Sequence, residues 1–352
     1  MSGSPSLGER AAGKDCQHAE MPDKTKPLVS IGVPVFNGET GLARALDSLL
    51  KQDYPNLEII ISDNGSTDAT CTIGQTYAAR DSRVKYFRSD ENRGAIWNFN
   101  RVFELSTGEY FMWAAHDDQR EPSCVSACLE KMEASPNAVL CQAHTAMFIE
   151  GRKELLCLAN LNSYDSVAGV AGRYRETLER FPATAMYGLY RVSAVCRTKL
   201  LQHCIATDLA FIQELSIYGD FAQVPQVLFR YVGRPKWNTV DQDYNFFFGR
   251  GKKPWWYSPF LALFWNHFRR IASAEIPSNV KLRLWTILTR HHIAQAAFKL
   301  VLKASGRLCP EPTKENLARD IYCRWMLSPN VEIGDEGLFL ERVIKPSVGW
   351  WR

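Results

Sequence analysis

The sequence lacks the patterns that mark several large classes of protein. It has ten cysteines, yet none of them form Cys-x-x-Cys, and no Cys/His spacing is typical of a zinc site. No stretch approaches the roughly 18 apolar residues that a membrane-spanning helix needs. No Gly-x-Gly-x-x-Gly follows the first apolar run, and Gly-x4-Gly-Lys-Ser/Thr does not occur. These absences disfavour a zinc module, an integral membrane protein, a dinucleotide-binding fold and a P-loop protein.

The chain also lacks a large excess of charge of either sign. It has 42 Lys and Arg against 38 Asp and Glu, a formal net charge of +4, so nucleic acid is not implied as a partner. Residues 1–26 are polar and contain no apolar segment of a signal peptide, so we expect a disordered tail. Read as reduced thiols, the cysteines predict a cytoplasmic protein.

What the sequence does contain is an alternation of apolar runs and helical patterns. Four runs have the β-branched or apolar composition of buried strands. Between them, leucines and aromatic residues recur at helical spacing. Such alternation predicts an α/β fold, with a mostly parallel sheet and helices on both faces. The predicted strands are residues 28–33, 57–62, 84–87 and 110–114.

Each predicted strand ends in polar residues or proline. In an open α/β sheet, ligands bind at the carboxyl ends of the strands, so these residues predict one ligand crevice. Asp117 and Asp118 after the fourth strand would suit a hard divalent cation. The alternative is that this pair caps the helix expected near Pro122. The residues at the four strand ends are Pro34, Asn37, Asp63, Asn92, Asp117 and Asp118.

Five segments in this order resemble the nucleotide-sugar domain of family 2 glycosyltransferases, over about residues 28–235. The resemblance implies a GT-A fold, which is Rossmann-like, and a transfer that inverts the anomeric centre. The segments are Pro34-x-x-Asn37-x-Glu39, Ser48-Leu-Leu-x-Gln52, Glu58 to Asp68 (Glu-Ile-Ile-Ile-Ser-Asp-Asn-Gly-Ser-Thr-Asp), Asn92-x-Gly94, and Gly108-Glu-Tyr with Asp117-Asp118.

By position, the resemblance implies a set of nucleotide-binding residues. An Asp at position 63 can accept the imide N–H of uracil or thymine, so a UDP- or dTDP-sugar is the expected donor. Glu39 could instead be a first-turn helix carboxylate, and Arg93, Asn98 and Asn100 are alternatives near the diphosphate. The full set is Pro34, Val35, Asn37, Glu39, Asp63, Asn64, Asn92, Asn98 and Asp117.

The family's Asp-x-Asp metal motif is altered in this chain, because Ala115 stands at its first position. The resemblance makes Asp117 the direct ligand of Mg²⁺ or Mn²⁺ and gives Asp118 a supporting role. His116 could ligate or could be a spacer. The substitution bears on how tightly a metal binds more than on the fold.

The general base implied by the resemblance is Asp208, which precedes the helical pattern of residues 209–218. Asp208 also stands where a helix N-cap belongs, and the two roles are compatible. Glu214 and His203 are weaker candidates for the base. Arg191 could contact the acceptor or the diphosphate, or could form a structural ion pair.

After Gly233 the composition changes to aromatic and basic residues at helical spacing, which predicts a C-terminal helical extension. We therefore expect a tail at 1–26, a GT-A domain at 27–235 and the extension at 236–352. Aromatic residues with Lys and Arg suit an interfacial helix, and a lipid-linked acceptor would then be natural. A packed extension or a homodimer contact is the alternative. The prominent aromatic residues are Trp237, Trp255, Trp256, Tyr257, Phe260, Phe264 and Trp265.

These patterns predict a metal-dependent glycosyltransferase that acts on a hydroxyl of a glycan or a lipid-linked acceptor. Ala115 favours a rival interpretation, a non-catalytic relative that only binds a nucleotide sugar or a glycan. A nucleotidyltransferase should carry a basic residue in a Gly-rich loop after the first strand, and Pro34 to Gly38 has none.

Overall fold

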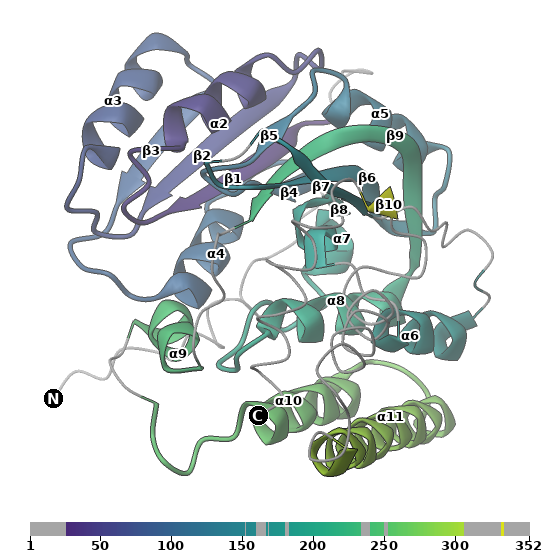
Figure 1. Ribbon diagram of the computed structural model, residues 1–352. Coiled ribbons are helices and arrows are strands. Elements are labelled where there is room, and N and C mark those ends of the chain that lie inside the picture. The colour runs from purple at the N-terminus through teal and green to yellow at the C-terminus, as the bar shows by residue number, and fades with distance from the viewer. Residues whose placement is uncertain are drawn as a thin grey trace, which may run out of the picture.

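The computed structural model describes residues 26–151, 153–159, 167, 169–179, 183–233, 240–249, 253–305 and 332–333. The predicted N-terminal tail lies outside these residues except for Lys26. The elements form one α/β body beneath which long helices run (Figure 1). The strands are β1 (Val29–Val35), β2 (Leu57–Asp63), β3 (Val84–Arg88), β4 (Tyr110–Trp113), β5 (Gln119–Arg120), β6 (Ala138–Ile149), β7 (Leu155–Ala159), β8 (Leu189–Arg191), β9 (Asp220–Gly233) and β10 (Glu332–Ile333).

The helices confirm the predicted alternation in the first half of the chain. Each of the first four strands is followed by a helix, with the short β5 interposed after β4. The helices are α2 (Leu42–Leu50), α3 (Thr70–Arg80), α4 (Ala95–Glu104), α5 (Cys124–Glu133), α6 (Gly169–Glu179), the 3-10 helix η1 (Ala183–Tyr187), α7 (Val192–Val195), α8 (Thr207–Tyr218), α9 (Val240–Phe248), α10 (Pro259–Ser273) and α11 (Ser278–Ser305).

The sheet has a parallel half and a mixed half. β1 lies between β2 and β4 and pairs parallel with both, and β2 pairs parallel with β3. The order across the sheet is β3-β2-β1-β4-β8-β6-β7-β10, and β8 runs antiparallel to β4 and β6. β9 pairs with β6 and with β5. The parallel half brings the carboxyl ends of β1, β2 and β4 to one edge.

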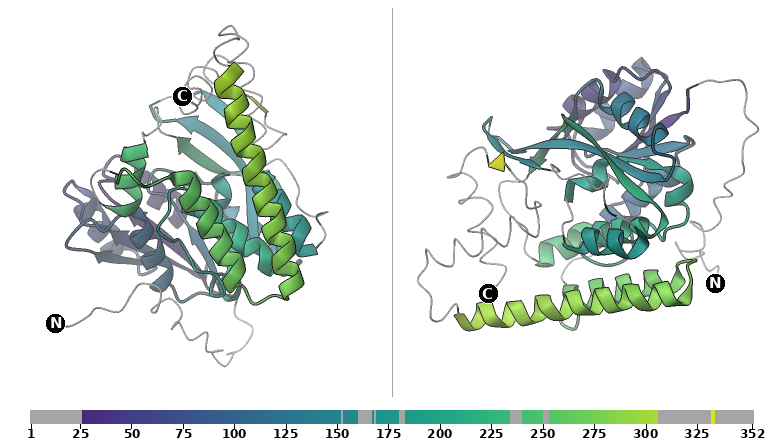
Figure 2. Two further views of the ribbon diagram at one scale, coloured as in Figure 1. Left: turned by 90° about the horizontal axis from the view of Figure 1, so that it is seen from below. Right: turned by 90° about the vertical axis from the view of Figure 1, so that its right-hand side faces the viewer.

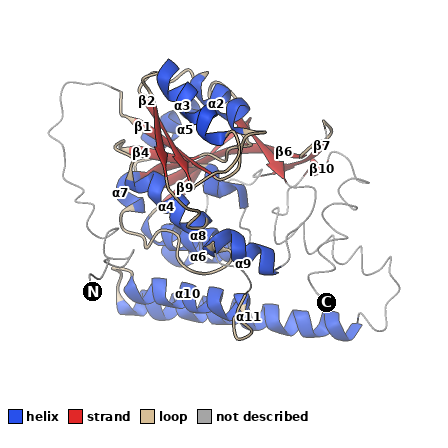
Figure 3. Ribbon diagram, turned by 90° about the vertical axis from the view of Figure 1, so that its left-hand side faces the viewer, coloured by secondary structure: helices blue, strands red, loops and turns tan. Residues whose placement is uncertain are grey.

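Helices cover both faces of the sheet, as Figure 3 shows. Successive side chains of a strand point to opposite faces, so the buried residues of β4 divide between two cores. Met112 packs with α2 and α5, whereas Phe111 and Trp113 pack with α4 and α8. This two-sided burial explains why the strands are apolar runs rather than alternating patterns.

Two parts of the fold were not predicted. The stretch 152–180, which the sequence left unassigned, contains β7 and α6. Glu332–Ile333 pairs antiparallel with β7 at the sheet edge, so the expected extension is not helical throughout.

The C-terminal helices share a core with the rest of the molecule. Ile271 of α10 and Leu284 and Leu288 of α11 are wholly buried in one cluster with Tyr174 of α6 and Ile217 of α8. Figure 2 shows α10 and α11 side by side as the outermost layer, with α6 and α8 between them and the sheet. Among the described residues, no helix is both long and apolar enough to cross a membrane.

Candidate functional site

The loop after β1 is joined to the loop after β2 through Asn37. The Asn37 N–H donates to Ser66 Oγ at 2.9 Å, and Asn37 Oδ1 accepts from the Thr67 N–H at 2.9 Å. Asn37 has φ 51°, a left-handed conformation that asparagine tolerates better than most residues. The side chain of Asn37 is therefore held at the exposed tip of the strand edge.

Glu39 and Asp68 form a second, reciprocal link between the same loops. The Glu39 N–H donates to Asp68 Oδ2 at 3.0 Å, and the Ala69 N–H donates to Glu39 Oε2 at 3.0 Å. Asp68 Oδ1 also accepts from the N–H of Thr70, the first residue of α3, although the N-cap of this helix is Ala69. Glu39 thus assists the start of α3, while its side chain stays exposed.

Asp63 ends β2 and is completely buried. Its Oδ1 accepts from the Ser66 N–H at 2.8 Å, and its Oδ2 accepts from the Tyr86 hydroxyl at 2.6 Å. Burial and the hydrogen bond to Asp63 raise the pKa of Tyr86, so the hydroxyl stays a donor. With 0% of Asp63 exposed, a direct contact with a base would require this loop to open. In this structure Asp63 shapes the loop.

Two buried asparagines tie the remaining strand ends together. Asn64 donates to Asn92 Oδ1 at 2.9 Å and accepts from the Arg93 N–H at 3.0 Å. Asn98 of α4 donates to the carbonyl oxygens at the ends of β1 and β2, Val35 at 3.2 Å and Ser62 at 2.9 Å. The predicted residues of β1 and β2, Pro34 included, are thus buried supports, and Asn92 is the exposed member of this group.

The two carboxylates after β4 differ in environment. Asp118 is 1% exposed, its Oδ1 accepts from the Val232 N–H at 2.8 Å, and its Oδ2 has no partner within the described chain. Burial, and then the charge of Asp117, raise the pKa of Asp118 to about 8. Asp117 keeps partial exposure. Neither caps a helix, because β5 follows at once and α5 begins only at Cys124.

Glycines in the loop after β1 bring Asp117 against the first strand. A Cβ on Gly41 would lie 2.9 Å from the His116 carbonyl oxygen and 3.0 Å from Asp117 Cα. A Cβ on Gly38 would lie 2.6 Å from the His116 ring. The ring of His116 is therefore packed against this loop, which favours its role as a spacer. Arg44 of α2 donates to the Asp117 carbonyl oxygen at 3.2 Å.

The carboxylates of Asp117 and Asp118 fit a cation that takes its remaining ligands from a phosphate. No group of three or more His, Cys, Asp or Glu side chains among the described residues could hold a metal alone. The partly exposed carboxylate of Asp117 and the unpartnered Oδ2 of Asp118 nevertheless offer the hard oxygen ligands that Mg²⁺ and Mn²⁺ accept. Phosphate oxygens and water would have to complete the shell.

Asp208 lies in the first turn of α8, two residues later than its predicted capping position. The N-cap is Ala206, whose φ of 60° is left-handed, so the predicted capping role of Asp208 is wrong. Burial raises the pKa of Asp208, while hydrogen bonds from the main-chain N–H groups of Leu209 and Asp208 act in the opposite direction. The side chain keeps partial exposure, as a group that meets a substrate must.

The pKa of Tyr187 is influenced both by Asp208 and by the carboxylates after β4. Burial raises its pKa, and the neighbouring Tyr231, Asp118, Asp117 and Asp208 add to the rise. The charges of all three carboxylates therefore favour the protonated form of the Tyr187 hydroxyl. Sequence reasoning did not single out Tyr187, because it belongs to an apolar run and the groups that influence it come from distant segments.

Arg120 fixes the position of Tyr187. Its buried guanidinium donates to the carbonyl oxygens of Trp113 at 2.7 Å and Tyr187 at 3.1 Å, and it lies 4.9 Å from the ring centroid of Phe229. Sequence reasoning missed Arg120 too. The available signal was an arginine two residues after the acidic pair, within a short strand.

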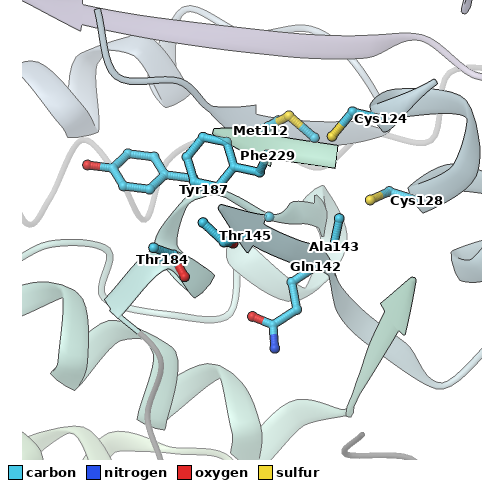
Figure 4. Close-up of a pocket in the computed structure, with 10 residues that line it drawn as sticks. Met112, Cys124, Cys128, Gln142, Ala143, Thr145, Thr184, Tyr187 and Phe229 are labelled. Atoms are coloured by element: carbon cyan, nitrogen blue, oxygen red, sulfur yellow. The ribbon is translucent and has the colours of Figure 1, made fainter. Parts of the chain in front are cut away.

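A small cavity lies behind Tyr187 (Figure 4). Its space for the centre of a water molecule is about 10 Å³, room for roughly one water and too little for a sugar. The Tyr187 hydroxyl points away from Cys124 and Cys128 on the opposite wall. The two cysteines are buried, as expected for small apolar residues. The cavity is lined by Met112, Cys124, Cys128, Gln142, Ala143, Thr145, Thr184, Tyr187, Gly188 and Phe229.

Arg191 does not lie with the other predicted residues. In β8 it pairs with Tyr110 at the amino end of β4, whereas Asp117 follows the carboxyl end. Its guanidinium donates to the Ala138 and Met132 carbonyl oxygens, each at 3.2 Å, and to the Tyr110 hydroxyl at 3.0 Å. The predicted acceptor or diphosphate contact is corrected to a structural role, made by hydrogen bonds rather than an ion pair.

Two further candidates are also structural. Asn100 pairs with the main chain of Leu201. Glu214, buried in α8, forms an ion pair with Arg270 of α10 and accepts from the Lys199 N–H at 2.9 Å. Since its carboxylate is engaged and 2% exposed, Glu214 is not placed to act as a base.

The fold is that of the GT-A class of glycosyltransferases. TarS of S. aureus, in complex with UDP, has a TM-score of 0.56 at 17% identity, over 84% of this chain and 80% of that chain. Mannosyltransferase PcManGT from Pyrobaculum calidifontis, in complex with GDP-Man and Mn²⁺, has a TM-score of 0.50 at 15% identity, over 98% and 91%. At these identities the likeness shows the fold.

Sequence comparison points to a family. The model of the family Glycosyl transferase family 2 matches residues 30–202, so this segment is similar to the family 2 glycosyltransferases. An uncharacterized glycosyltransferase of Rickettsia typhi is 35% identical over 134 residues, 35% of this chain and 41% of that protein. The GalNAc(5)-diNAcBac-PP-undecaprenol beta-1,3-glucosyltransferase of Campylobacter jejuni is 33% identical over 106 residues, 30% and 34%. The alignments span less than half of these relatives.

Proposed function

We propose that this protein transfers a sugar from a UDP- or dTDP-sugar to a hydroxyl of a glycan or lipid-linked acceptor, with inversion at the anomeric centre. The observation that carries the proposal is the strand edge, where the parallel pairing of β1 with β2 and β4 gathers the polar strand ends and where the buried Asp118 keeps an unpartnered Oδ2. This edge offers a cation-binding side, and Asp208, whose charge adds to the raised pKa of Tyr187 together with those of Asp117 and Asp118, offers the proton-accepting side that a single displacement requires.

The donor is proposed to bind across the exposed tips of the strand edge. Asn37, Glu39 and Asn92 are exposed there, and buried Asp63, Asn64 and Asn98 hold them in place. Phe36, 41% exposed beside Asn37, offers a ring on which a base can stack. The UDP bound to TarS supports a pyrimidine nucleotide as the donor moiety.

Asp117, with Asp118 in support, would hold a divalent cation beside the donor diphosphate. When bound, such a cation offsets negative charge on the departing nucleoside diphosphate. The Mn²⁺ in PcManGT supports this choice of cofactor. Other residues of this chain position the two carboxylates: Arg44 and Gly41 set the position of Asp117, and the Val232 N–H holds Asp118.

Asp208 is proposed as the general base. An acceptor hydroxyl has too high a pKa to attack alone, and removal of its proton during attack is worth about 10²–10⁴ in rate. The raised pKa of Asp208 makes it a stronger base than an exposed aspartate. The acceptor of the Campylobacter jejuni relative, linked to PP-undecaprenol, supports a lipid-linked acceptor here.

The test separates binding from transfer. A thermal-shift panel of UDP-, dTDP- and GDP-sugars, with and without Mn²⁺, should identify the donor, since stabilisation grows with ligand concentration over Kd. With that donor, Asp208→Asn should lower the rate of transfer by about 10²–10⁴ and leave the donor-induced shift unchanged. Asp53→Asn, at an exposed position beyond α2, is the matched control and should keep full activity.

Ala115 favours one rival function, a non-catalytic relative that binds a nucleotide sugar or a glycan. In that case the wild-type protein would show the donor-induced shift, yet neither transfer to acceptor nor loss of the donor sugar would be detected for any donor in the panel.

A further inference from the structure

The layer formed by α10, α11 and the segment before α10 exposes large apolar side chains to solvent. Monomeric soluble proteins seldom gather such residues at one place without a use for them. The two most exposed are consecutive tryptophans in a turn. The exposed fractions are Trp255 92%, Trp256 67%, Leu261 63%, Trp265 57%, Leu282 65% and Ile293 63%.

On α10 these side chains share one face with a basic residue. Leu261, Trp265 and Arg269 are exposed and follow each other at intervals of four, so they lie on one side of the helix. The opposite side carries Ile271 and His267 into the core.

On α11 the same division holds. Leu282 and Ile293, with the threonines between them, are exposed on the side opposite the wholly buried Leu284 and Leu288. The stacked rings of Trp265, Phe268 and Trp285, with centroids 5.4 Å and 4.8 Å apart, connect the two helices. The exposed sides of α10 and α11 therefore form one surface, and this surface together with the Trp255–Trp256 turn that leads into α10 is called the outer face.

The segment that carries the outer face is also rich in basic residues. Residues 253–305 contain eight Lys or Arg and one Glu, a formal charge of +7, whereas the whole chain has +4. Arg269, Arg283 and Arg290 are exposed, and none of them makes an ion pair with a described residue. The rest of the molecule is thus slightly acidic.

We propose that the outer face binds the surface of an anionic membrane, with Trp255, Trp256, Leu261 and Trp265 at the headgroup level and the arginines on lipid phosphates. Tryptophan is favoured at membrane–water interfaces, and each basic residue near an anionic surface adds to the attraction. The helices would lie along the surface, as amphipathic interfacial helices do.

The same segment reaches the loop before Asp208. Tyr257, next to the tryptophan pair, accepts a hydrogen bond at 3.0 Å from the N–H of Ile205, three residues before Asp208. Arg270 of α10 donates to the carbonyl oxygen of Leu200 at 2.6 Å. A membrane-bound outer face would present a lipid-linked acceptor near Asp208; this consequence rests on the proposed function, but membrane binding does not.

The test is co-sedimentation of the full chain with two kinds of vesicle, phosphatidylcholine alone and phosphatidylcholine mixed with phosphatidylglycerol. We expect binding to the anionic vesicles that weakens as salt rises. The double substitution Trp255→Ala and Trp256→Ala should weaken vesicle binding by about tenfold or more, because it removes the two highly exposed rings that would enter the interface. Arg283→Glu should weaken the binding by about tenfold, because one positive charge is replaced by a negative charge, a change of two units.

Arg80→Glu is the matched control, since Arg80 is exposed on α3, on the other side of the molecule, and should leave binding unchanged. All these positions are exposed, and a thermal melt checks that the variants fold. Failure to sediment with anionic vesicles, or equal binding by every variant, overturns the proposal. So does a concentration-dependent dimer that the tryptophan variants abolish in the absence of vesicle binding. None of these readouts requires sugar transfer, so the proposed reaction would stand.

Discussion

At the scale of single residues, Asp118 is the group whose chemistry the fold changes most. In an unfolded chain its pKa would be near 3.9, but burial and the charge of Asp117 raise the folded value to about 8. Between these two values the folded protein holds a proton that the unfolded chain has released. The contribution to stability is therefore fully present at low pH and is lost as pH rises through about 8.

We predict that Asp118→Asn flattens this dependence in protein stripped of divalent cations. The amide oxygen can still accept from the Val232 N–H, and an amide has no proton to lose. The melting temperature of the wild-type protein should fall between about pH 4 and pH 8, and that of the variant should fall less. Equal slopes, with Asp53→Asn as the reference, would contradict the assignment.

The residue scale also shows where sequence reading succeeds. Asp63, Asn92 and Asp117 were expected at one strand edge, because each follows a recognisable apolar run, and parallel strands bring such positions together. Tyr187 and Arg120 were not expected. Their contact joins residues 67 positions apart, and no local pattern encodes such a distance.

At the scale of elements, the ion pair between Arg270 of α10 and Glu214 of α8 is the polar link that holds the C-terminal layer in place. Each side chain is 1% exposed, and Arg270 also donates to Leu200. A buried charge that loses its partner typically costs about 3–5 kcal/mol, whereas replacing both members by apolar residues is often nearly neutral.

We therefore predict that Arg270→Met lowers the free energy of unfolding by about 3–5 kcal/mol, and that adding Glu214→Met restores most of the loss. Denaturant unfolding of the wild type, of the two single variants Arg270→Met and Glu214→Met, and of the double variant gives the coupling energy directly. Arg269→Met, one position away and exposed, is the control and should change stability by less than about 0.5 kcal/mol. A double variant as unstable as Arg270→Met would refute the pairing.

At the scale of the whole molecule, the segments on the two sides of the expected domain boundary at residue 235 share one hydrophobic core. α10 and α11 bury Ile271, Leu284 and Leu288 against Tyr174 and Ile217. Burying each such aliphatic side chain contributes about 1.5–3 kcal/mol, and Glu214 depends on α10 for its partner. These contributions approach the whole stability of a typical domain.

We predict that a chain of residues 27–235 does not form a stable folded monomer. Its near-ultraviolet circular dichroism should be weak, and it should show no cooperative melt. A chain lacking only residues 1–26, which the sequence predicts to be disordered, is the control and should melt like the full chain. A cooperative melt of 27–235 near the full-length temperature would instead establish the predicted boundary.

By itself, the sequence determined the parallel half of the fold, the order of its elements and the strand edge where the carboxylates gather, because apolar periodicity and chain-breaking residues are local signals. Only the tertiary structure decided that Asp118 is buried, that Arg120 holds the main chain of Tyr187 and that Arg191 faces the opposite edge. The place of Arg191 depends on the antiparallel direction of β8 and on its register, in which Arg191 meets Tyr110, and Asp118 is held by Val232 of the distant β9. Register arises from contacts between distant segments, and hydrophobic patterning constrains it only weakly.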